Sequence, residues 1–278
     1  MRIFVTGATG FVGGNVARDL AALGHAVVPG RRPSLTLEAP TIPEAVDAVV
    51  HCAAIASVAA CDADPARAES INVTGSRTLA EEAARRGIPL VLTSTDLVFD
   101  GGAAPYGEDA PTSAPTLYGQ TKARAERAVL DADPGHVVLR LALVVGAHDG
   151  APGGFLAWLV DGLRTRRPTA LYTNQVRAPL FVGDVAPVAH AAVTRRLAGG
   201  VYHLASERGV TREDVGRAVA RAFALPDDAI VPTALDRGPT LPALDDCTLD
   251  ASKVRRALGI AFTPLDQALA RVRAALSG

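Results

Sequence analysis

A glycine-rich turn near the start of the chain limits the possible folds more than any other feature. An apolar run at residues 2–7 leads into a turn that contains Gly7, Gly10 and Gly13, and a stretch with helical periodicity follows. Glycine allows the backbone to turn sharply and lets a ligand approach it closely. Free amides at the start of the helix, at the positive end of its dipole, can then bind a pyrophosphate. A second apolar run at residues 25–30 completes the pattern of a dinucleotide-binding βαβ unit.

Apolar runs alternate with helical stretches through the first half of the chain. The further strand-like runs are residues 48–54, 88–95 and 136–146, and the helical stretches are 10–24, 65–87 and 118–132. Continuous apolar strands separated by helices indicate a parallel sheet that is covered on both faces. We therefore predict an α/β fold with a doubly wound, Rossmann-type parallel sheet.

We expect two portions in this fold. Residues 1–150 should form the NAD(P)-binding Rossmann domain, and residues 174–205 should return to it. Residues 151–173 and 206–278, where the alternation loosens, should form a smaller C-terminal substrate-binding portion. The cleft between the two portions is then the expected active site.

Composition argues against several classes of partner. The 278 residues carry a formal net charge of −1 and include only 4% aromatic residues, which does not favour binding to nucleic acid. No apolar run reaches the ~18 residues needed to span a bilayer, and the first residues do not read as a signal peptide. We expect a cytoplasmic protein without a membrane partner. The spacing of the cysteines, histidines and acidic residues suggests no metal site.

Three polar residues lie in or beside apolar strands, where a polar group needs a partner. They are His51, Arg140 and His203. We expect Arg140 to form a structural ion pair or hydrogen bond. For the two histidines, hydrogen-bonded positions in the core or at the sheet edge are favoured over metal ligation.

The end of the second strand predicts which dinucleotide binds. An NAD-type site carries an acidic residue there, which binds the ribose 2′-hydroxyl. This chain has "VVPGRRPS" and no acid, so Arg31 and Arg32 could pair with a 2′-phosphate instead. We predict a preference for NADPH, with NADH open as an alternative. Both arginines could also be solvated surface residues.

A tyrosine and a lysine lie four residues apart in the predicted helix at 118–132. Tyr118 and Lys122 should share one face of this helix. The preceding strand ends in Thr95, and Asp96 follows it. Because ligands bind at the carboxyl ends of the strands in such a sheet, these side chains should border the same crevice. Outside this context, a tyrosine such as Tyr118 is more often a packed helix residue.

Motifs along the chain point to a known family. "TGATGFVG", "STDLVFDG", "YGQTK", "LRLALVVG", "NQVRAPLFVGDVA" and "DCTLDASKVRRALGI" follow one another in this order. With them the chain resembles the extended short-chain dehydrogenase/reductases, and within these the dTDP-4-dehydrorhamnose reductase, or RmlD-like, group. The resemblance implies a catalytic set in which Tyr118 protonates a carbonyl oxygen and Thr95 positions the substrate. Lys122 and the positive charge of the oxidised nicotinamide should lower the pKa of Tyr118, and Lys122 should also hold the nicotinamide ribose.

The resemblance also implies which residues bind the two ligands. The expected cofactor-binding residues are Gly7, Thr9, Gly10, Phe11, Val12, Gly13, Arg31, Arg32, Ala53, Ala54, Asn72, Thr93, Tyr118 and Lys122. The expected substrate-binding residues are Thr95, Asp96, Phe155 and Arg177. Asn72 could equally be a buried residue that joins helix to strand, and Arg177 could equally be a surface charge. Homodimers are common in the family, so a homodimer is plausible.

The expected reaction is the reduction of a ketone by NADPH, with the 4-keto group of a nucleotide-linked deoxysugar as the first candidate. Leu97 stands where the related 4,6-dehydratases carry a glutamate for elimination. Gly154 and Asn174 replace an asparagine and an aspartate that are usual in the group, which leaves the sugar nucleotide open. The alternatives are a redox-neutral, epimerase-type reaction, a natural-product-tailoring reaction on a non-sugar substrate, and a non-catalytic NADP-binding regulatory subunit.

Overall fold

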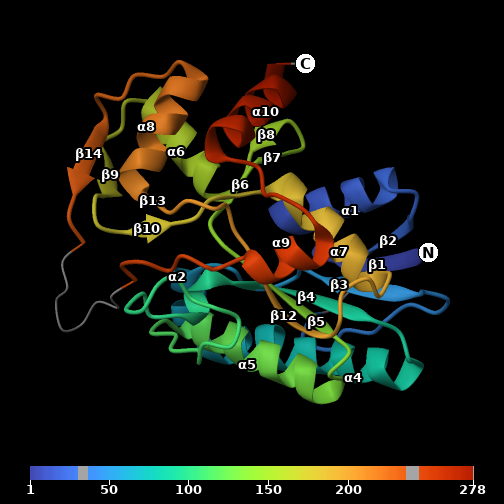
Figure 1. Cartoon of the computed structure of the whole chain (residues 1–278). Coiled ribbons are helices and arrows are strands. Elements are labelled where there is room, and N and C mark those ends of the chain that lie inside the picture. Colours follow the sequence, from blue (N-terminus) through green and yellow to red (C-terminus); the bar gives the residue numbers. More distant parts are fainter. Residues whose placement is uncertain (31–36, 236–243, 278) are drawn as a thin grey trace.

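A computed structural model describes residues 1–30, 37–235 and 244–277 of the 278-residue chain (Figure 1). Arg31 and Arg32 lie outside the described residues. The expected preference for NADPH therefore stays a prediction from the sequence.

Six parallel strands form the central sheet. They are β1 (Arg2–Thr6), β2 (Ala26–Gly30), β3 (Ala48–His51), β4 (Leu90–Thr95), β5 (Val137–Leu141) and β12 (Gly200–Leu204). Their spatial order is β12-β5-β4-β3-β1-β2, and all neighbouring strands are parallel. From β1 the chain adds β2 on one side and then crosses to β3 on the other, which makes this the switch point where such sheets bind ligands. The predicted doubly wound α/β fold is confirmed.

Helices cover both faces of this sheet (Figure 1). On one face lie α1 (Phe11–Ala22) and α7 (Val185–Val193), and on the other lie α4 (Ser76–Arg86) and α5 (Leu117–Ala132). Along β1, Ile3 and Val5 belong to the apolar core under the first pair of helices, and Phe4 belongs to the core under the second pair. Burial on both faces explains why the strands read as continuous apolar runs.

The helical stretch expected at residues 65–87 contains a π-helical turn. The helix begins as α3 (Pro65–Glu69), continues as the π-helix η1 (Ser70–Gly75) and ends as α4. Asp64 caps its start by accepting a hydrogen bond of 3.0 Å from the Arg67 amide. Gly87, with φ of +66°, ends it in the left-handed conformation. The short helix α2 (Val58–Ala63) precedes it.

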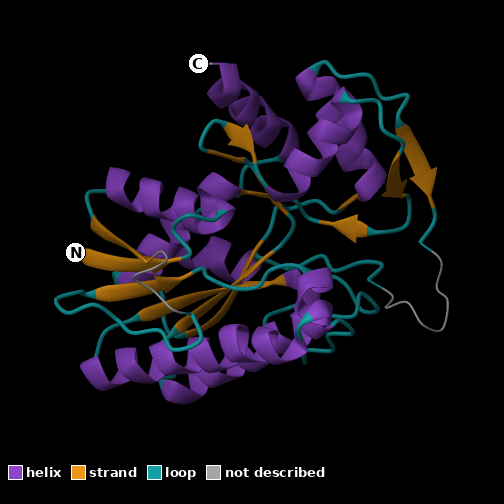
Figure 2. Ribbon diagram, turned by 180° about the vertical axis from the view of Figure 1, so that it is seen from behind, coloured by secondary structure: helices purple, strands orange, loops and turns teal. Residues whose placement is uncertain are grey.

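A second apolar core lies beyond the carboxyl ends of the strands, in the upper part of Figure 1. It is formed mainly by α6 (Gly154–Arg164), α8 (Arg212–Phe223), α10 (Leu265–Ser277) and the parallel pair β9 (Thr169–Tyr172) and β14 (Ile230–Thr233). Figure 2 shows this group from behind, as a separate layer above the sheet. Leu249, Val254 and Phe262 pack instead in the core of the sheet, although they lie within the segment 206–278. The division into two portions with the expected boundaries stays a prediction.

Short elements connect the two cores. The antiparallel pairs are β7 (Ala147–His148) with β8 (Ala151–Pro152) and β10 (Val176–Arg177) with β13 (Val210–Thr211). A parallel pair joins β6 (Val144–Val145) to β11 (Leu180–Phe181). The remaining elements are the 3-10 turns η2 (Asp96–Val98) and η3 (Val182–Asp184) and the helix α9 (Ser252–Leu258), which packs on β12.

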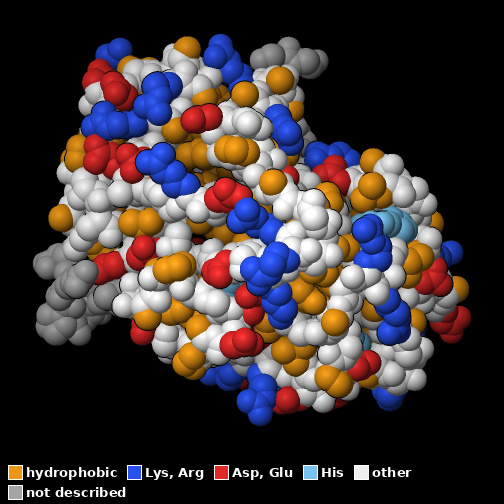
Figure 3. Space-filling view, viewed as in Figure 1, with side chains coloured by type: hydrophobic (Ala, Val, Ile, Leu, Met, Phe, Trp, Pro, Cys, Tyr) orange, Lys and Arg blue, Asp and Glu red, His pale blue; other side chains and the backbone are white. Residues whose placement is uncertain are grey.

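Charges of both signs are mixed over the face of the molecule seen in Figure 3, in keeping with the net charge of −1. Such a surface offers no broad cationic patch on this face to attract nucleic acid. None of the described helices combines the length and the apolar character needed to cross a bilayer.

Candidate active site

The glycine turn after β1 leaves no room for larger residues. Gly7 has φ of +69°, and a Cβ there would lie 2.9 Å from the Ala53 backbone nitrogen. A Cβ at Gly13 would lie 2.3 Å from the Gly7 carbonyl oxygen. α1 begins after Gly10 without a side-chain cap, so amides of its first turn can donate to an anion. Turn and helix thus fit a dinucleotide pyrophosphate at the switch point of the sheet.

A chain of buried hydrogen bonds holds the base of this turn. The Thr6 hydroxyl lies 2.6 Å from His51 Nδ1 and accepts a bond of 3.2 Å from the Ala53 amide. His51 Nε2 lies 3.0 Å from Ser76 Oγ, which itself donates to the Asn72 carbonyl at 2.6 Å. The Ser76 hydroxyl donates its only proton to that carbonyl. His51 therefore donates through Nε2 to Ser76 Oγ and accepts through Nδ1 from the Thr6 hydroxyl. Burial lowers the pKa of His51 to about 3, so the ring is neutral, as expected for a structural histidine.

Asn72 ties the loop after β3 to the helix that carries Tyr118. Its side-chain oxygen accepts from the Ile55 amide at 2.8 Å, and its amide nitrogen donates to the Ile55 carbonyl at 3.1 Å and to Thr121 Oγ1 at 3.0 Å. Thr121 Oγ1 in turn donates to the Tyr118 carbonyl at 2.8 Å. Both amide protons of Asn72 are therefore used within the chain, which favours the structural interpretation. Its expected contact with the cofactor stays a prediction.

Thr95, Asp96 and Tyr118 meet at the carboxyl end of β4. Tyr118 lies in the first turn of α5, whose cap is the Thr116 side chain, and Thr95 is the last residue of β4. The Thr95 side chain lies close enough to the Tyr118 hydroxyl to oppose the rise that burial causes in the pKa of the phenol. Thr95 Oγ1 also donates to Asp96 Oδ1 at 3.1 Å and accepts from the Leu97 amide at 3.2 Å. The structure thus brings together the tyrosine and the threonine that were predicted to act on one carbonyl oxygen.

Groups of the chain itself raise the pKa of Tyr118. Burial raises it, the nearby Asp96 carboxyl raises it further, and the Thr95 side chain opposes part of the rise. Desolvation of the phenolate outweighs the favourable interactions within the chain. The lowering expected from Lys122 together with the oxidised nicotinamide stays a prediction. A phenol that stays protonated at neutral pH is in the form that can donate a proton.

Lys122 lies one turn further along α5, and only 2% of it is exposed. Burial lowers the pKa of its ammonium to about 8, and the Glu126 carboxylate opposes this shift. Among the described residues, none forms a hydrogen bond with the Lys122 ammonium. A buried cation without such a partner is available to the hydroxyl groups of a ligand.

Ser94, next to Thr95, faces the other way and takes part in an ion pair. Its hydroxyl donates to Glu126, whose carboxylate binds Arg140 with Nη2 to Oε2 at 2.8 Å. Arg140 also lies 3.3 Å from His203 Nε2, and burial with this charge lowers the pKa of His203 to about 3. The structural pairing expected for Arg140 is confirmed. Ser94 is thereby occupied, which leaves Thr95 as the hydroxyl that faces the crevice.

Asp96 and Arg177 form a buried contact beside this site. Arg177 is only 1% exposed, and its Nε lies 3.5 Å from Asp96 Oδ2. The alternative that Arg177 is a surface charge is wrong. Arg212 lies in the first turn of α8, over the Phe155 ring, with 4.6 Å between Cζ and the ring centroid. It was not identified from the sequence as a candidate site residue. An arginine at the start of a helix is unfavourable with respect to the helix dipole, and this was the available signal.

The other expected cofactor-binding residues lie around the glycine turn and the strand ends, and their contact with the cofactor stays a prediction. Thr93 is buried and donates to the His51 carbonyl at 3.3 Å. Ala53 is buried against Gly7, and Ala54 follows it. The Phe11 ring packs against the backbone at Gly146, Gly153 and Gly154. The contact is close, since a Cβ at Gly153 would lie only 2.2 Å from the ring. Phe11 can thus reach a dinucleotide only with its backbone, as its neighbours Thr9 and Val12 also could.

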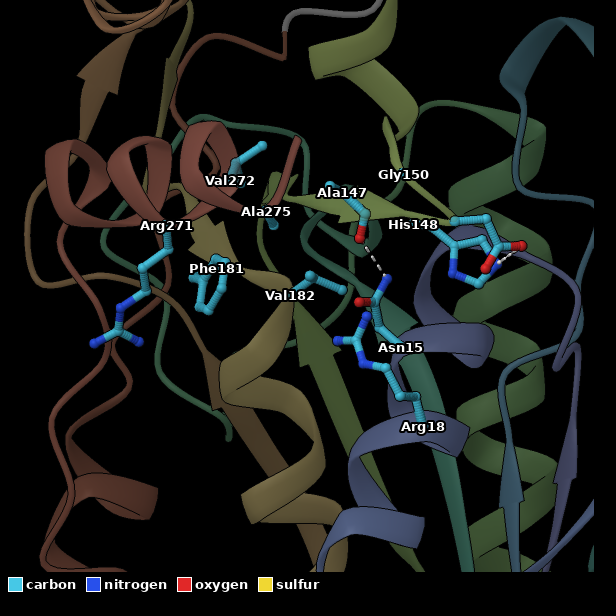
Figure 4. Close-up of a pocket in the computed structure, with 11 residues that line it drawn as sticks. Asn15, Arg18, Ala147, His148, Gly150, Phe181, Val182, Arg271, Val272 and Ala275 are labelled. Carbon is cyan, nitrogen blue, oxygen red and sulfur yellow. Dashed lines mark hydrogen bonds and ion pairs between the residues drawn. The ribbon is translucent and has the colours of Figure 1, made fainter. Parts of the chain in front are cut away.

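A separate cavity of about 190 Å³ lies between α1, β7 and α10 (Figure 4). Asn15 Nδ2 donates to the Ala147 carbonyl at 3.0 Å across it, and Arg271 points away from that bond. Its lining residues include neither Thr95, Tyr118 nor Lys122. The described residues contain no group of three or more His, Cys, Asp or Glu side chains placed to hold a metal ion. We therefore locate the candidate active site at the strand ends.

Comparison with known proteins identifies the family. The family model described as the RmlD substrate binding domain matches residues 1–277. The probable low-salt glycan biosynthesis reductase Agl14 of Haloferax volcanii is 33% identical, over 100% of this chain and 99% of that protein. The dTDP-4-dehydrorhamnose reductase of Mycolicibacterium smegmatis is 31% identical, over 95% of this chain and 81% of that protein. The methionine adenosyltransferase 2 subunit beta of Xenopus tropicalis is 31% identical, over 92% and 82%.

Solved structures show the same fold. The dTDP-4-dehydrorhamnose reductase of Clostridium acetobutylicum superposes with a TM-score of 0.89 at 23% identity, over 100% of both chains. The dTDP-4-dehydrorhamnose reductase of Bacillus anthracis, solved in complex with NADP, gives a TM-score of 0.84 at 18% identity, over 98% of this chain and 97% of that one. The resemblance inferred from the motifs is confirmed, and the chain belongs to the RmlD family of the extended short-chain dehydrogenase/reductases.

Proposed function

We propose that this protein uses NADPH to reduce a ketone, with the 4-keto group of a nucleotide-linked deoxysugar as the first candidate substrate. As a member of the RmlD family, the chain is an NAD(P)H-dependent oxidoreductase. The observation that carries the proposal is the proximity of the Thr95 and Tyr118 side chains at a strand end, with Lys122 one turn away. The names of two relatives, a glycan biosynthesis reductase and a dTDP-4-dehydrorhamnose reductase, support a sugar substrate.

The residues of the crevice divide the work between binding and proton transfer. When bound, the dinucleotide supplies the hydride for the carbonyl carbon. The amides after Gly7 and Gly10 bind its pyrophosphate, and the Lys122 ammonium binds its ribose hydroxyls. Thr95 turns its hydroxyl proton from Asp96 Oδ1 to the carbonyl oxygen and so holds that oxygen, and Tyr118 gives the oxygen its proton.

Lys122 also favours the product of the proton transfer. Once Tyr118 has given up its proton, a phenolate lies in a buried site. The ammonium one turn away stabilises this negative charge, whereas the carboxylate of Asp96 opposes it. The contact of Asp96 with Arg177 reduces that opposition, so the ion pair assists the transfer although it donates no proton itself.

The test is NADPH oxidation, followed at 340 nm with a panel of nucleotide-linked keto sugars and simple ketones. Replacing Tyr118 by Phe removes the proton donor and should lower kcat by about 10²- to 10⁴-fold while leaving cofactor affinity nearly unchanged. Tyr202→Phe is the matched control. Tyr202 lies in the outer strand β12, and its hydroxyl donates to the Ala198 carbonyl at 3.0 Å. Equal activity of wild type and Tyr118→Phe would rule out Tyr118 as the acid. The same assay with NADH measures the cofactor preference.

A regulatory role is the second candidate, because several relatives with 30–32% identity are methionine adenosyltransferase 2 subunits beta. A regulatory subunit would bind NADP tightly yet oxidise no NADPH with any ketone of the panel. A redox-neutral reaction would convert substrate without net consumption of NADPH. Turnover of ketones outside the sugar nucleotides would favour the natural-product alternative.

Two further expectations belong to the same proposal. We expect the protein to act in the cytoplasm and to form a homodimer, as many members of the family do. Light scattering after size exclusion measures the oligomeric state directly, and cell fractionation measures the location.

A further inference from the structure

The buried Arg177 and the partly buried Arg212 both interact with the Asp96 carboxylate, beside the candidate catalytic residues. Arg177 Nε lies 3.5 Å from Asp96 Oδ2, and both Arg177 and Arg212 interact electrostatically with the Asp96 carboxyl. Arg177 directs its Nη1 to backbone carbonyls, with the shortest bond, 2.6 Å, to that of Val176. Both arginines thus face the same carboxylate. Buried polar groups are normally paired, so a buried guanidinium nitrogen without a partner calls for a further acceptor.

Arg212 is the arginine whose hydrogen bonds are incomplete. Its Nε donates to Gln175 Oε1 at 3.0 Å, and its guanidinium lies over the Phe155 ring. Its Nη1 is buried, and none of the described residues accepts a hydrogen bond from it. Burial, with the charge of Arg177, lowers the pKa of Arg212 to about 10. The first turn of a helix also disfavours a cation, so neither the helix nor its neighbours complete this site.

The incomplete donor lies close to the reacting groups. Asp96 Oδ1 accepts from Thr95, whose side chain lies beside Tyr118, whereas Asp96 Oδ2 faces Arg177. One carboxylate therefore connects the expected position of the carbonyl oxygen to the two cations. Asp96 Oδ2 is itself buried without a hydrogen-bond donor among the described residues, so the site presents one unused donor and one unused acceptor.

We propose that Arg212, with Arg177 beside it, binds an oxyanion of the substrate and thereby selects anionic ketones over neutral ones. The oxyanion is a carboxylate or a phosphoryl group, since a guanidinium forms charge-assisted hydrogen bonds with either. Asp96 Oδ2 accepts a hydrogen bond from a neighbouring hydroxyl of the same molecule. That the ligand is a ketone substrate rests on the proposed function, whereas the binding of an oxyanion does not.

Binding can be measured without turnover. Trp158 is the single tryptophan of the chain, and its ring lies 5.6 Å from that of Phe155, which Arg212 covers. Its fluorescence is followed during titration with inorganic pyrophosphate, malonate or glucose, at constant ionic strength and with NADP⁺ saturating the dinucleotide site. One of the two anions should bind saturably to the wild type, and glucose should not.

Variants of one helix separate a specific site from general charge. Arg212→Met should weaken binding of the anion about tenfold or more, as expected for the loss of a charge-assisted hydrogen bond. Arg212→Lys should retain part of the affinity, and it serves in place of Arg212→Met if that variant does not fold. The matched control is Arg217→Met, because Arg217 lies on α8 but forms surface ion pairs with Glu213 and Asp227. Arg217→Met should bind the anion like the wild type.

Each outcome decides the proposal. Arg212-dependent binding of pyrophosphate alone identifies a phosphoryl group, binding of malonate alone identifies a carboxylate, and both results support the site. Anion binding that is absent, or unchanged in Arg212→Met and Arg212→Lys, overturns it. If the protein reduces no ketone, the titration still measures anion binding at Arg212. Failure of the proposed function is therefore distinguished from failure of the anion site. If ketones are reduced, Arg212→Met should raise KM about tenfold for an anionic ketone and leave a neutral one unaffected.

Discussion

The buried ion pair between Glu126 and Arg140 allows a direct test of how the core beneath the crevice is stabilised. Each side chain is 5% exposed, and Arg140 donates to both carboxylate oxygens, through Nε at 3.1 Å to each and through Nη2 at 2.8 Å. Replacing Glu126 by Gln keeps the shape but leaves the guanidinium buried without a counter-ion. Breaking a buried pair in this way costs about 3–5 kcal/mol, a large part of the ~5–15 kcal/mol that stabilises a domain.

A surface pair of the same chemistry provides the control. Glu69 in α3 pairs with Arg124 in α5, whereas Glu126 in α5 pairs with Arg140 in β5, and the side chains of Glu69 and Arg124 are 45% and 49% exposed. Glu69→Gln should therefore lower the free energy of unfolding by no more than about 1 kcal/mol. Urea denaturation, followed by circular dichroism and extrapolated to water, gives the free energy for both variants and the wild type.

Removing both partners separates the pairing from the burial. A variant with Met at both positions 126 and 140 should be more stable than Glu126→Gln, because it buries no unpaired charge. The reasoning is refuted if Glu126→Gln loses no more stability than Glu69→Gln, since the guanidinium would then not depend on its buried counter-ion.

Two further predictions concern the turn and Lys122. Gly13→Ala should raise the Kd for NADPH at least about tenfold, because the new Cβ meets the Gly7 carbonyl oxygen and overpacking of this kind costs about 1–3 kcal/mol. Titration calorimetry measures the Kd. The control is Gly107→Ala, whose Cβ meets nothing within 4 Å. Burial lowers the pKa of Lys122 from 10.5 to about 8, so between these values the unfolded chain binds more protons than the folded one. The free energy of unfolding should therefore rise with pH across this window, by up to about 3 kcal/mol relative to Lys122→Met. Parallel pH profiles of the two proteins in urea denaturation would contradict it.

Local chemistry made the turn and the crevice predictable from the sequence. Gly7 and Gly13 are needed because a Cβ at either position would clash with backbone atoms. Their identity as glycines is visible in the sequence, so the turn could be predicted from it. Thr95 and Tyr118 come from a strand end and a helix start, and the rule for parallel sheets is enough to bring them together. The apolar alternation was sufficient for the order of strands and helices, because both faces of the sheet are buried.

Features that depend on tertiary packing were not predictable. The π-helical turn at Ser70–Gly75 could not be read from the helical periodicity, although Asn72 within it bonds to Ile55 and Thr121. Arg212 stands 35 positions after Arg177, and only the antiparallel pairing of β10 with β13 brings the two together. The direction of the pKa shift of Tyr118 depends on burial, which residue spacing does not reveal.

The path of the chain through the two cores limits how the molecule can move. The polypeptide leaves the sheet after β5, returns for α7 and β12, leaves again for α8, packs α9 on β12 and ends in α10. Several covalent crossings thus link the layers on either side of the crevice. Any movement of the upper layer relative to the sheet must therefore change the backbone angles of all these connections together.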